Sequence, residues 1–112
     1  MSEPGPPVTI VVDGPTHDGV KLTVRGEIDF RQCERFVREV TDQIGQAGEA
    51  AVLTLNVWGV TYCDSAGVAA LMEVRQACDR AGWTLILSEV SPFLHRVLDV
   101  TSLSNWFGLT TP

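Results

Sequence analysis

A serine beside an aspartate is the feature of this sequence with the clearest chemical use. Residues 64–67 read Asp-Ser-Ala-Gly and lie between an apolar run and a segment with helical periodicity. Hydrolases place a nucleophilic serine on such a strand–turn–helix segment, within Gly-x-Ser-x-Gly, but Cys63 stands at the first glycine position. The base would have to be His17 in an expected hairpin loop or His95 on the outward side of an expected short helix. These positions argue against a Ser–His hydrolase and leave it as the weakest alternative.

Ser65 has a second possible use at the same place. Helix N-termini expose unpaired amide groups and the positive end of the helix dipole, and both stabilise a phosphate. A phosphoryl group on Ser65 would therefore leave the fold intact while adding about two negative charges to any surface that it contacts. The alternative is that Ser65, or Asp64 before it, only caps the helix. The residue types alone leave both interpretations open.

The sequence indicates no metal, nucleotide or cofactor site. Its three cysteines, Cys33, Cys63 and Cys78, are widely spaced and form no Cys-x-x-Cys pair, which disfavours a disulfide framework or a zinc site. No glycine-rich phosphate loop follows an expected strand. Cys63 adjoins the Asp-Ser pair, so a redox brake on the serine stands beside the simpler interpretation of an inert buried thiol.

The composition of the chain limits the kinds of protein that it can be. The chain has 112 residues, of which 45% are hydrophobic and 20% charged, as expected for one globular domain. The formal net charge is −6 without a basic cluster, which argues against binding to nucleic acid or anionic membranes. The sequence shows neither a membrane-spanning apolar run nor a signal peptide, so we expect a cytoplasmic protein.

The first half of the chain predicts a tail, a hairpin and a helix. Residues 1–7 carry three prolines and a glycine and predict a flexible tail, followed by a single domain over residues 8–112. The run 8–12 predicts a strand that residues 13–15 end, and the alternation over 20–25 predicts its hairpin partner. Asp29 and Gln32 resemble a capping box. Cys33, Val37, Val40 and Ile44 then predict a helix that ends near residues 45–48.

The second half alternates strands with helices. Residues 51–57 predict a buried strand, and a second apolar run over 60–63 leads to the helix that Asp64 or Ser65 begins. A strand over 83–88 precedes a short helix that Ser91 caps and Pro92 opens. Residues 103–109 suggest a short edge strand. This order predicts an α/β domain with a mixed sheet.

The three tryptophans have two interpretations. Trp58, Trp83 and Trp106 are scattered, and such indoles usually pack in a core rather than form a ligand slot. Trp58 is the exception, because it lies in the expected loop before Asp64. An exposed indole at that position would anchor a partner protein.

Several stretches together resemble the STAS domain family of bacterial anti-sigma factor antagonists. Residues 22–29 (Leu-Thr-Val-Arg-Gly-Glu-Ile-Asp) match its early strand and turn, and 55–57 (Leu-Asn-Val) match its central strand. Residues 64–67 match its Asp-Ser-x-Gly signature. The segments 91–98, headed by Ser-Pro, and 101–103 (Thr-Ser-Leu) resemble its last motifs. The resemblance covers about residues 8 to 109.

The resemblance implies a STAS fold, with a mixed sheet of four to five strands and about three helices packed against it. It also implies an anti-sigma factor antagonist without catalysis, metal or cofactor. Such a protein binds an anti-sigma factor serine kinase while unphosphorylated, which frees the sigma factor, and is released when its serine is phosphorylated; a serine phosphatase reverses the mark. By position that serine is Ser65. The expected partner-binding residues are Asp29, Asn56, Trp58, Asp64, Ser65, Ala66, Gly67 and Val68.

Three departures from the family pattern accompany the resemblance. Trp58 stands where a small or polar residue is usual, and Cys63 replaces a common aliphatic residue. The sequence given ends at Pro112 without the family's usual last helix, which we expect to leave an apolar patch that favours a homodimer. A non-switching STAS scaffold subunit of a stress-signalling complex or a lipid-transport ATPase remains the alternative function.

Overall fold

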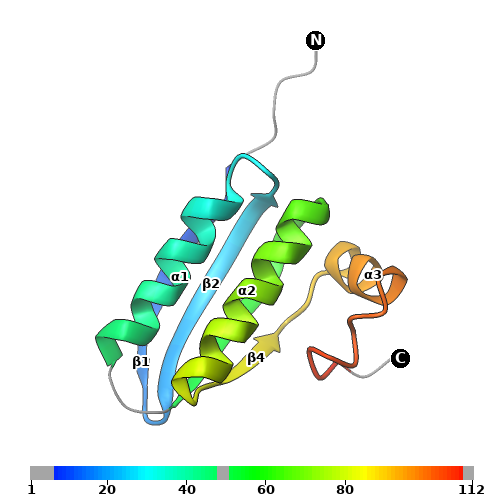
Figure 1. Cartoon of the computed structure of the whole chain (residues 1–112). Helices are drawn as coiled ribbons and strands as arrows, with labels where there is room; N and C mark the ends of the chain where they lie inside the picture. The colour runs from blue at the N-terminus through cyan, green and yellow to red at the C-terminus, as the bar shows by residue number, and fades with distance from the viewer. Residues whose placement is uncertain (1–6, 48–50, 110–112) are drawn as a thin grey trace.

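The computed structural model describes residues 7–47 and 51–109. Within them, four strands form one sheet in the order β1-β2-β3-β4 (Figure 1). The strands are β1 (Thr9–Thr16), β2 (Gly19–Ile28), β3 (Val52–Cys63) and β4 (Thr84–Ser88). The helices are α1 (Cys33–Ala47), α2 (Ser65–Ala81) and α3 (Pro92–Val100). β1 and β2 pair antiparallel, whereas β2–β3 and β3–β4 are parallel, so the predicted mixed α/β sheet is confirmed with four strands.

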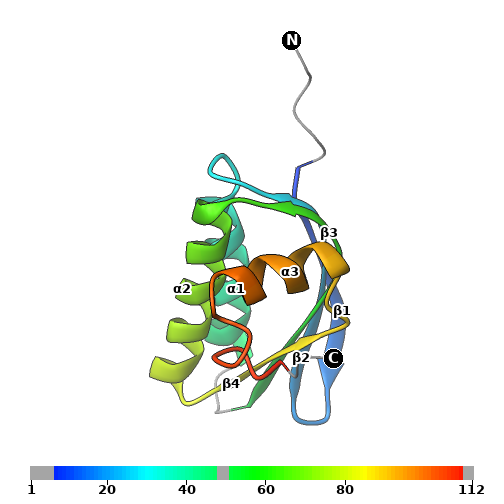
Figure 2. The same cartoon turned by 90° about the vertical axis from the view of Figure 1, so that its right-hand side faces the viewer.

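The helices occupy two places on the sheet. α1 and α2 lie side by side over one face, as the two perpendicular views show (Figures 1 and 2). β4 pairs only with residues 52–56 of the much longer β3. α3 packs against the remaining part of β3, where the Ser91 hydroxyl donates a 2.9 Å hydrogen bond to the Val60 carbonyl. α3 therefore lies against the part of β3 with which β4 does not pair.

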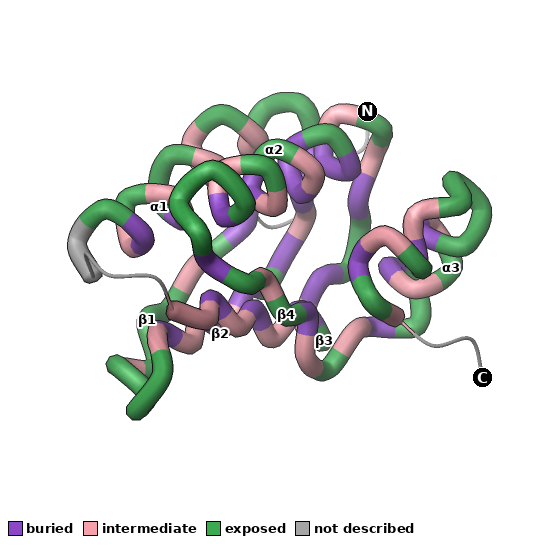
Figure 3. The backbone as a smooth tube through the Cα atoms, turned by 60° about the horizontal axis from the view of Figure 1, so that its bottom comes forward, coloured by how far each residue is buried: buried purple, intermediate pink, exposed green. Residues whose placement is uncertain are grey.

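The core lies between the sheet and the helix pair. Buried and partly exposed residues alternate along most of β2 and β3 (Figure 3). Among the buried ones, Leu22 and Leu55 are fully buried. The predicted inward residues Val40 of α1 and Leu71 of α2 are buried against them. Phe36 is also fully buried, although the periodicity that predicted α1 did not include it. Burying a side chain of this size contributes about 1.5–3 kcal/mol, so Phe36 is a principal core residue.

The prediction that residues 13–15 end the first strand is wrong. β1 continues to Thr16, and its register with β2 shifts between Val12 and Pro15. Gly14 has a φ of +106°, a conformation that costs glycine little, and absorbs the irregularity as a bulge. Pro15 is tolerated because β1 is an edge strand, where a missing amide hydrogen breaks no ladder.

The prediction of a break after Val57 is also wrong. β3 runs without interruption from Val52 to Cys63, so Trp58 lies within a strand and not in a loop. Two register shifts against β2 accommodate the irregular part of the pairing. Gly59 packs directly on the neighbouring strand, because a Cβ atom there would lie 2.6 Å from Cγ of Arg25.

Two further predicted details differ from the structure. Asp29 and Gln32 do not form a capping box, because α1 begins only at Cys33, after a turn in which the Gln32 amide donates to the Asp29 carbonyl. Residues 103–109 form turns and no strand; their backbone bonds are local, such as the Phe107 amide to the Leu103 carbonyl.

The chain ends lie partly outside the described residues. The tail predicted over 1–7 falls there except for Pro7, which forms a bridge with Glu27 of β2. Among the described residues, no helix is long and apolar enough to span a membrane.

Candidate functional site

Ser65 is the first residue of α2, directly after the end of β3. Its side chain is exposed, at the end of the helix where backbone amides have no intrahelical acceptor. Of the two predicted caps, the structure selects Asp64 as the N-cap. Ser65 is therefore not needed to cap the helix, and its hydroxyl is available for chemistry.

Asp64 joins two segments of the chain at this site. One carboxylate oxygen accepts a 2.8 Å hydrogen bond from the Gly67 amide, and the other accepts a 3.1 Å bond from the Phe30 amide. Phe30 belongs to the loop between β2 and α1. The carboxylate therefore both begins α2 and holds the neighbouring loop beside Ser65.

The residues after Ser65 mostly pack inward. Gly67 is buried, and a Cβ atom there would lie only 2.0 Å from the Ile28 carbonyl oxygen and 2.8 Å from the Cys63 sulfur. Val68 is buried in the core. Ala66 is half-exposed on the side of α1. Of these three predicted partner-binding residues, only Ala66 presents a side chain at the surface.

Asp29 lies in the loop that Asp64 holds, and it is only 4% exposed. Its carboxylate accepts hydrogen bonds from the Arg31 amide and guanidinium. The Arg31 guanidinium holds the pKa of this carboxyl below its usual value, so Asp29 is ionised at neutral pH. The structure therefore gives Asp29 the task of shaping the loop, and Arg31 is the exposed member of the pair.

Exposed aromatic residues near the site were missed by the sequence analysis. Phe30, in the loop tied to Asp64, is 72% exposed. Tyr62 lies two residues before Asp64, and its ring is 5.9 Å from that of Phe93 at the start of α3. Phe30 could have been noticed as an aromatic residue among polar neighbours, whereas the Tyr62–Phe93 pair joins segments that are distant in sequence.

Asn56 and Trp58 lie away from Ser65. Asn56 sits in the middle of the sheet, opposite Thr23 of β2 and Ser88 of β4, and its side chain accepts a 3.1 Å bond from the Trp58 amide. It precedes the end of β3 by seven residues, or about 23 Å of strand. Trp58 is 59% exposed, as predicted, but is about 17 Å of strand from Cys63. The structure does not bring these two residues to the Ser65 end.

The histidines considered as bases do not complete a hydrolase site. His17 lies in the turn beside Gly19, which pairs with the start of β3, whereas Ser65 follows the opposite end of that strand. His95 pairs with Asp99 on α3, 3.2 Å away. Within residues 7–47 and 51–109, neither histidine hydrogen-bonds to Ser65, and no group of acidic, histidine or cysteine side chains has the arrangement of a metal site.

Cys63 is buried behind the site. The pKa of its thiol is raised to about 12, mainly because the thiol is buried and to a lesser extent because the negative charge of Asp64 is nearby. A neutral, covered thiol is a poor nucleophile. This favours the inert thiol over the redox brake.

The fold resembles known anti-sigma factor antagonists. The structure of SpoIIAA from Bacillus, an anti-sigma factor antagonist in its unphosphorylated form, matches with a TM-score of 0.70 and 20% identity, covering 92% of this chain and 89% of that one. Its phosphorylated form matches with a TM-score of 0.66. An anti-sigma factor antagonist from Mycobacterium paratuberculosis also matches at 0.70 and 20% identity, covering 94% and 86% of the two chains.

A transporter carries the same fold. The murine anion transporter Slc26a9 matches with a TM-score of 0.70 and 18% identity, over 91% of this chain but only 19% of the transporter. No curated protein matches the sequence. The sequence profile of the STAS domain matches residues 10–111, nearly the whole chain. Together with the four-stranded mixed sheet and the Asp-Ser-Ala-Gly start of α2, this match shows that the chain belongs to the STAS domain family.

Proposed function

We propose that this protein is a bacterial anti-sigma factor antagonist that acts in the cytoplasm and is switched by phosphorylation of Ser65. Unphosphorylated, it binds an anti-sigma factor serine kinase, so that the sigma factor is freed. Phosphorylation releases it, and a serine phosphatase restores the binding form. The observation that carries the proposal is the exposed hydroxyl of Ser65 at the first position of α2, with Asp64 as the cap.

The helix start suits a reversible phosphate. The Ser65 oxygen would attack the γ-phosphorus of ATP, the bond from that phosphorus to the β–γ bridging oxygen would break with ADP as the leaving group, and the hydroxyl proton would pass to a base of the kinase. The phosphate would then lie near the positive end of the α2 dipole, which favours the folded protein. SpoIIAA, whose structure is known in both unphosphorylated and phosphorylated forms, supports such a switch by analogy.

The added charge is large enough to release a partner. Two like charges 4 Å apart repel by about 4 kcal/mol at an effective dielectric constant of 20. Since 1.4 kcal/mol corresponds to a tenfold change in affinity, even part of this repulsion would weaken binding by about 100-fold. The net charge of −6 disfavours nucleic acid as the partner.

The proposal is tested by incubating the protein with ATP and each purified anti-sigma factor kinase of its host. We expect one kinase to add a single phosphoryl group, which peptide mass spectrometry assigns to Ser65 and a serine phosphatase removes. Ser65→Ala should bind that kinase and remain unmodified, and Ser65→Glu should bind poorly. Thr61→Ala, at an exposed hydroxyl four residues earlier, is the control and should be phosphorylated normally. Absence of labelling by every kinase, or labelling elsewhere, would overturn the proposal.

A second candidate is a non-switching STAS subunit of a larger assembly. The observation in its favour is the match to Slc26a9, in which a domain of this fold occupies about a fifth of an anion transporter. A pull-down from the native host that recovers a transporter or its ATPase and no kinase would support this candidate. A lipid-transport ATPase and a stress-signalling complex are the assemblies that we expect in that case.

A further inference from the structure

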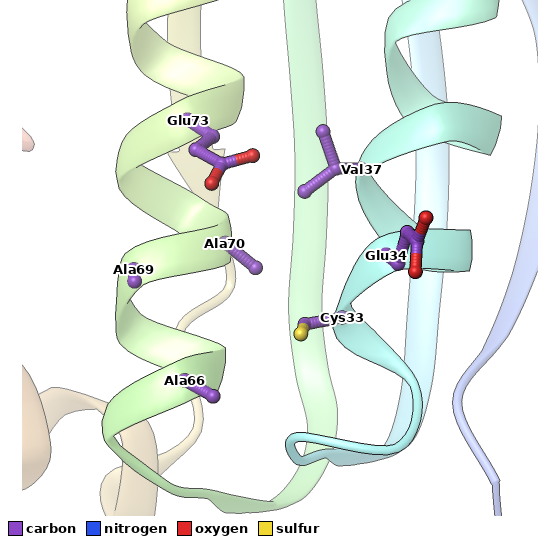
Figure 4. A pocket seen from close by; sticks show the side chains of 7 residues that line it. All are labelled: Cys33, Glu34, Val37, Ala66, Ala69, Ala70 and Glu73. Atoms are coloured by element: carbon purple, nitrogen blue, oxygen red, sulfur yellow. The ribbon is translucent and has the colours of Figure 1, made fainter.

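A groove between α1 and α2 begins at Ala66, the residue after Ser65 in the sequence (Figure 4). It has a volume of about 250 Å³ and is open to solvent. The residues that line it are Cys33, Glu34 and Val37 of α1 and Ala66, Ala69, Ala70 and Glu73 of α2. Ala66 directly follows the exposed Ser65, so the groove opens within one residue of the serine along α2.

The lining combines an apolar floor with a carboxylate from each helix. The alanines of α2 and Val37 supply apolar surface without bulk. Glu34 lies on α1, and Glu73 extends from α2 toward the gap (Figure 4). Both glutamates are exposed, and neither forms an ion pair with a residue in the described part of the chain. In Figure 4 the Glu34 carboxylate lies over α1 and points away from α2, so Glu73 supplies the charge nearest to the gap. An apolar channel with a free carboxylate at its rim is complementary to a long basic side chain, whose methylene stem packs while its charge stays near solvent.

The size and charge of the groove narrow the choice of occupant. Its volume lies below the roughly 300–1,000 Å³ of small-molecule sites, so it suits a side chain better than a metabolite. The terminal segments 1–6 and 110–112 contain no lysine or arginine and cannot supply that side chain. A second copy is disfavoured because each chain carries a net charge of −6.

We propose that this groove binds an arginine or lysine side chain of the anti-sigma factor kinase and so positions the kinase over Ser65. This inference rests on the proposed function and adds the chemistry of the contact. The cationic head lies near the Glu73 carboxylate, with Glu34 on the opposite helix, and its stem packs on Ala66, Ala69 and Val37. The kinase makes this contact when it binds, before phosphate transfer, and the residues of the groove take no part in the transfer itself.

Charge reversal tests the electrostatic half of the contact. The affinity of the kinase is measured for wild type, Glu34→Arg, Glu73→Arg and the double variant. We expect the double variant to bind at least about tenfold more weakly, since each close charge pair at an interface contributes appreciably. Asp42→Arg makes the same change of charge at an exposed α1 position outside the groove, and we expect it to bind within about twofold of wild type.

Filling the groove tests the packing half without changing charge. Ala69→Trp should block entry and raise the KM for Ser65 phosphorylation by about tenfold while kcat stays unchanged, because the reacting groups are intact. Gln76→Trp is the matched control, on the same exposed side of α2 and about 10 Å further from Ser65. Circular dichroism and thermal unfolding verify that each variant is folded.

The outcomes separate the inference from the function. If wild type binds no kinase of its host, the proposed function fails and the inference falls with it. If wild type is phosphorylated on Ser65 but the double variant and Ala69→Trp bind as well as their controls, the inference alone is overturned. Restored binding of the double variant by a kinase in which one arginine or lysine is replaced by glutamate would identify the occupant.

Discussion

Ser65 and Asp64 divide two tasks at the start of α2. The Asp64 carboxylate satisfies the Gly67 amide and holds the Phe30 amide, so it fixes the backbone around the serine. Ser65 is exposed and carries no capping task. This division would let the proposed phosphorylation of Ser65 leave the helix intact.

Substitution of Asp64 tests this division. Asp64→Ala removes the cap and the bond to the loop, and we expect it to lower the free energy of unfolding by about 2 kcal/mol, roughly 1 kcal/mol for each contact. Asp64→Asn keeps an oxygen for the Gly67 amide but loses the second acceptor, so its loss should be about half as large. Urea unfolding measures both variants. Equal stability of Asp64→Asn and wild type would show that the bond to Phe30 contributes nothing.

The buried thiols give a pH dependence with a defined sign. The pKa of Cys63 rises to about 12 and that of Cys78 to about 11 in the folded protein, against an ordinary value of 9.0. The unfolded chain therefore loses these protons first as the pH rises. We expect the protonated thiols to make their full contribution to the free energy of unfolding below pH 9. This contribution should decline between about pH 9 and 12, as measured by thermal unfolding across that range. Cys63→Ala/Cys78→Ala should flatten this decline, and an unchanged profile in that variant would contradict the assignment.

The same burial predicts selective thiol labelling. At mildly alkaline pH, Cys33 should react first with a thiol reagent because it is half-buried, whereas Cys63 and Cys78 are buried and protonated. Mass spectrometry of labelled peptides identifies the order. Rapid labelling of Cys63 in the native protein would revive the redox brake.

At the scale of elements, the N-terminus of α2 is seated directly against the end of β2. Gly67 permits this approach, because any side chain would enter the space of the Ile28 carbonyl. The contact places Ser65 at the C-terminal ends of β2 and β3 and keeps α2 beside α1, so that the groove between the two helices forms.

Two glycine-to-alanine substitutions separate packing from helix propensity. Gly67→Ala should destabilise the protein by about 2 kcal/mol or more, because the new methyl group would overlap a backbone oxygen. Gly45→Ala, in α1, meets no heavy atom within 4 Å and should stabilise the protein by about 0.5–1 kcal/mol. Chemical unfolding compares both with wild type. A neutral Gly67→Ala would mean that α2 can move away from β2 at little cost.

For the whole molecule, stability is expected to be highest in the central strands. β2 and β3 are paired on both sides and carry the fully buried residues Leu22 and Leu55, whereas β1 and the turns over 103–109 lie at the periphery. Hydrogen exchange should therefore be slowest in β2 and β3 and faster in β1. Exchange in β1 as slow as in β3 would contradict this expectation and indicate that the outer edge of β1 is covered.

Much of this protein follows from its sequence because the relevant signals are local. Helical spacing, alternation and the Ser-Pro and Asp-Ser caps act within a few residues, so they predicted the order of the elements and the exposed serine at a helix start. The STAS motifs added the family, which the match over residues 10–111 confirms. The same local signals failed at Gly14 and Trp58, where strand pairing overrode turn and loop preferences.

Only the tertiary structure decided what lies around Ser65. The bond from Phe30 to Asp64 spans 34 residues, and the groove joins residues of α1 and α2 that no spacing relates. The separation of Asn56 and Trp58 from the site depends on the uninterrupted length of β3. These features come from strand register and helix packing, which are determined by contacts across the whole core, whereas capping and periodicity are properties of the neighbouring residues themselves.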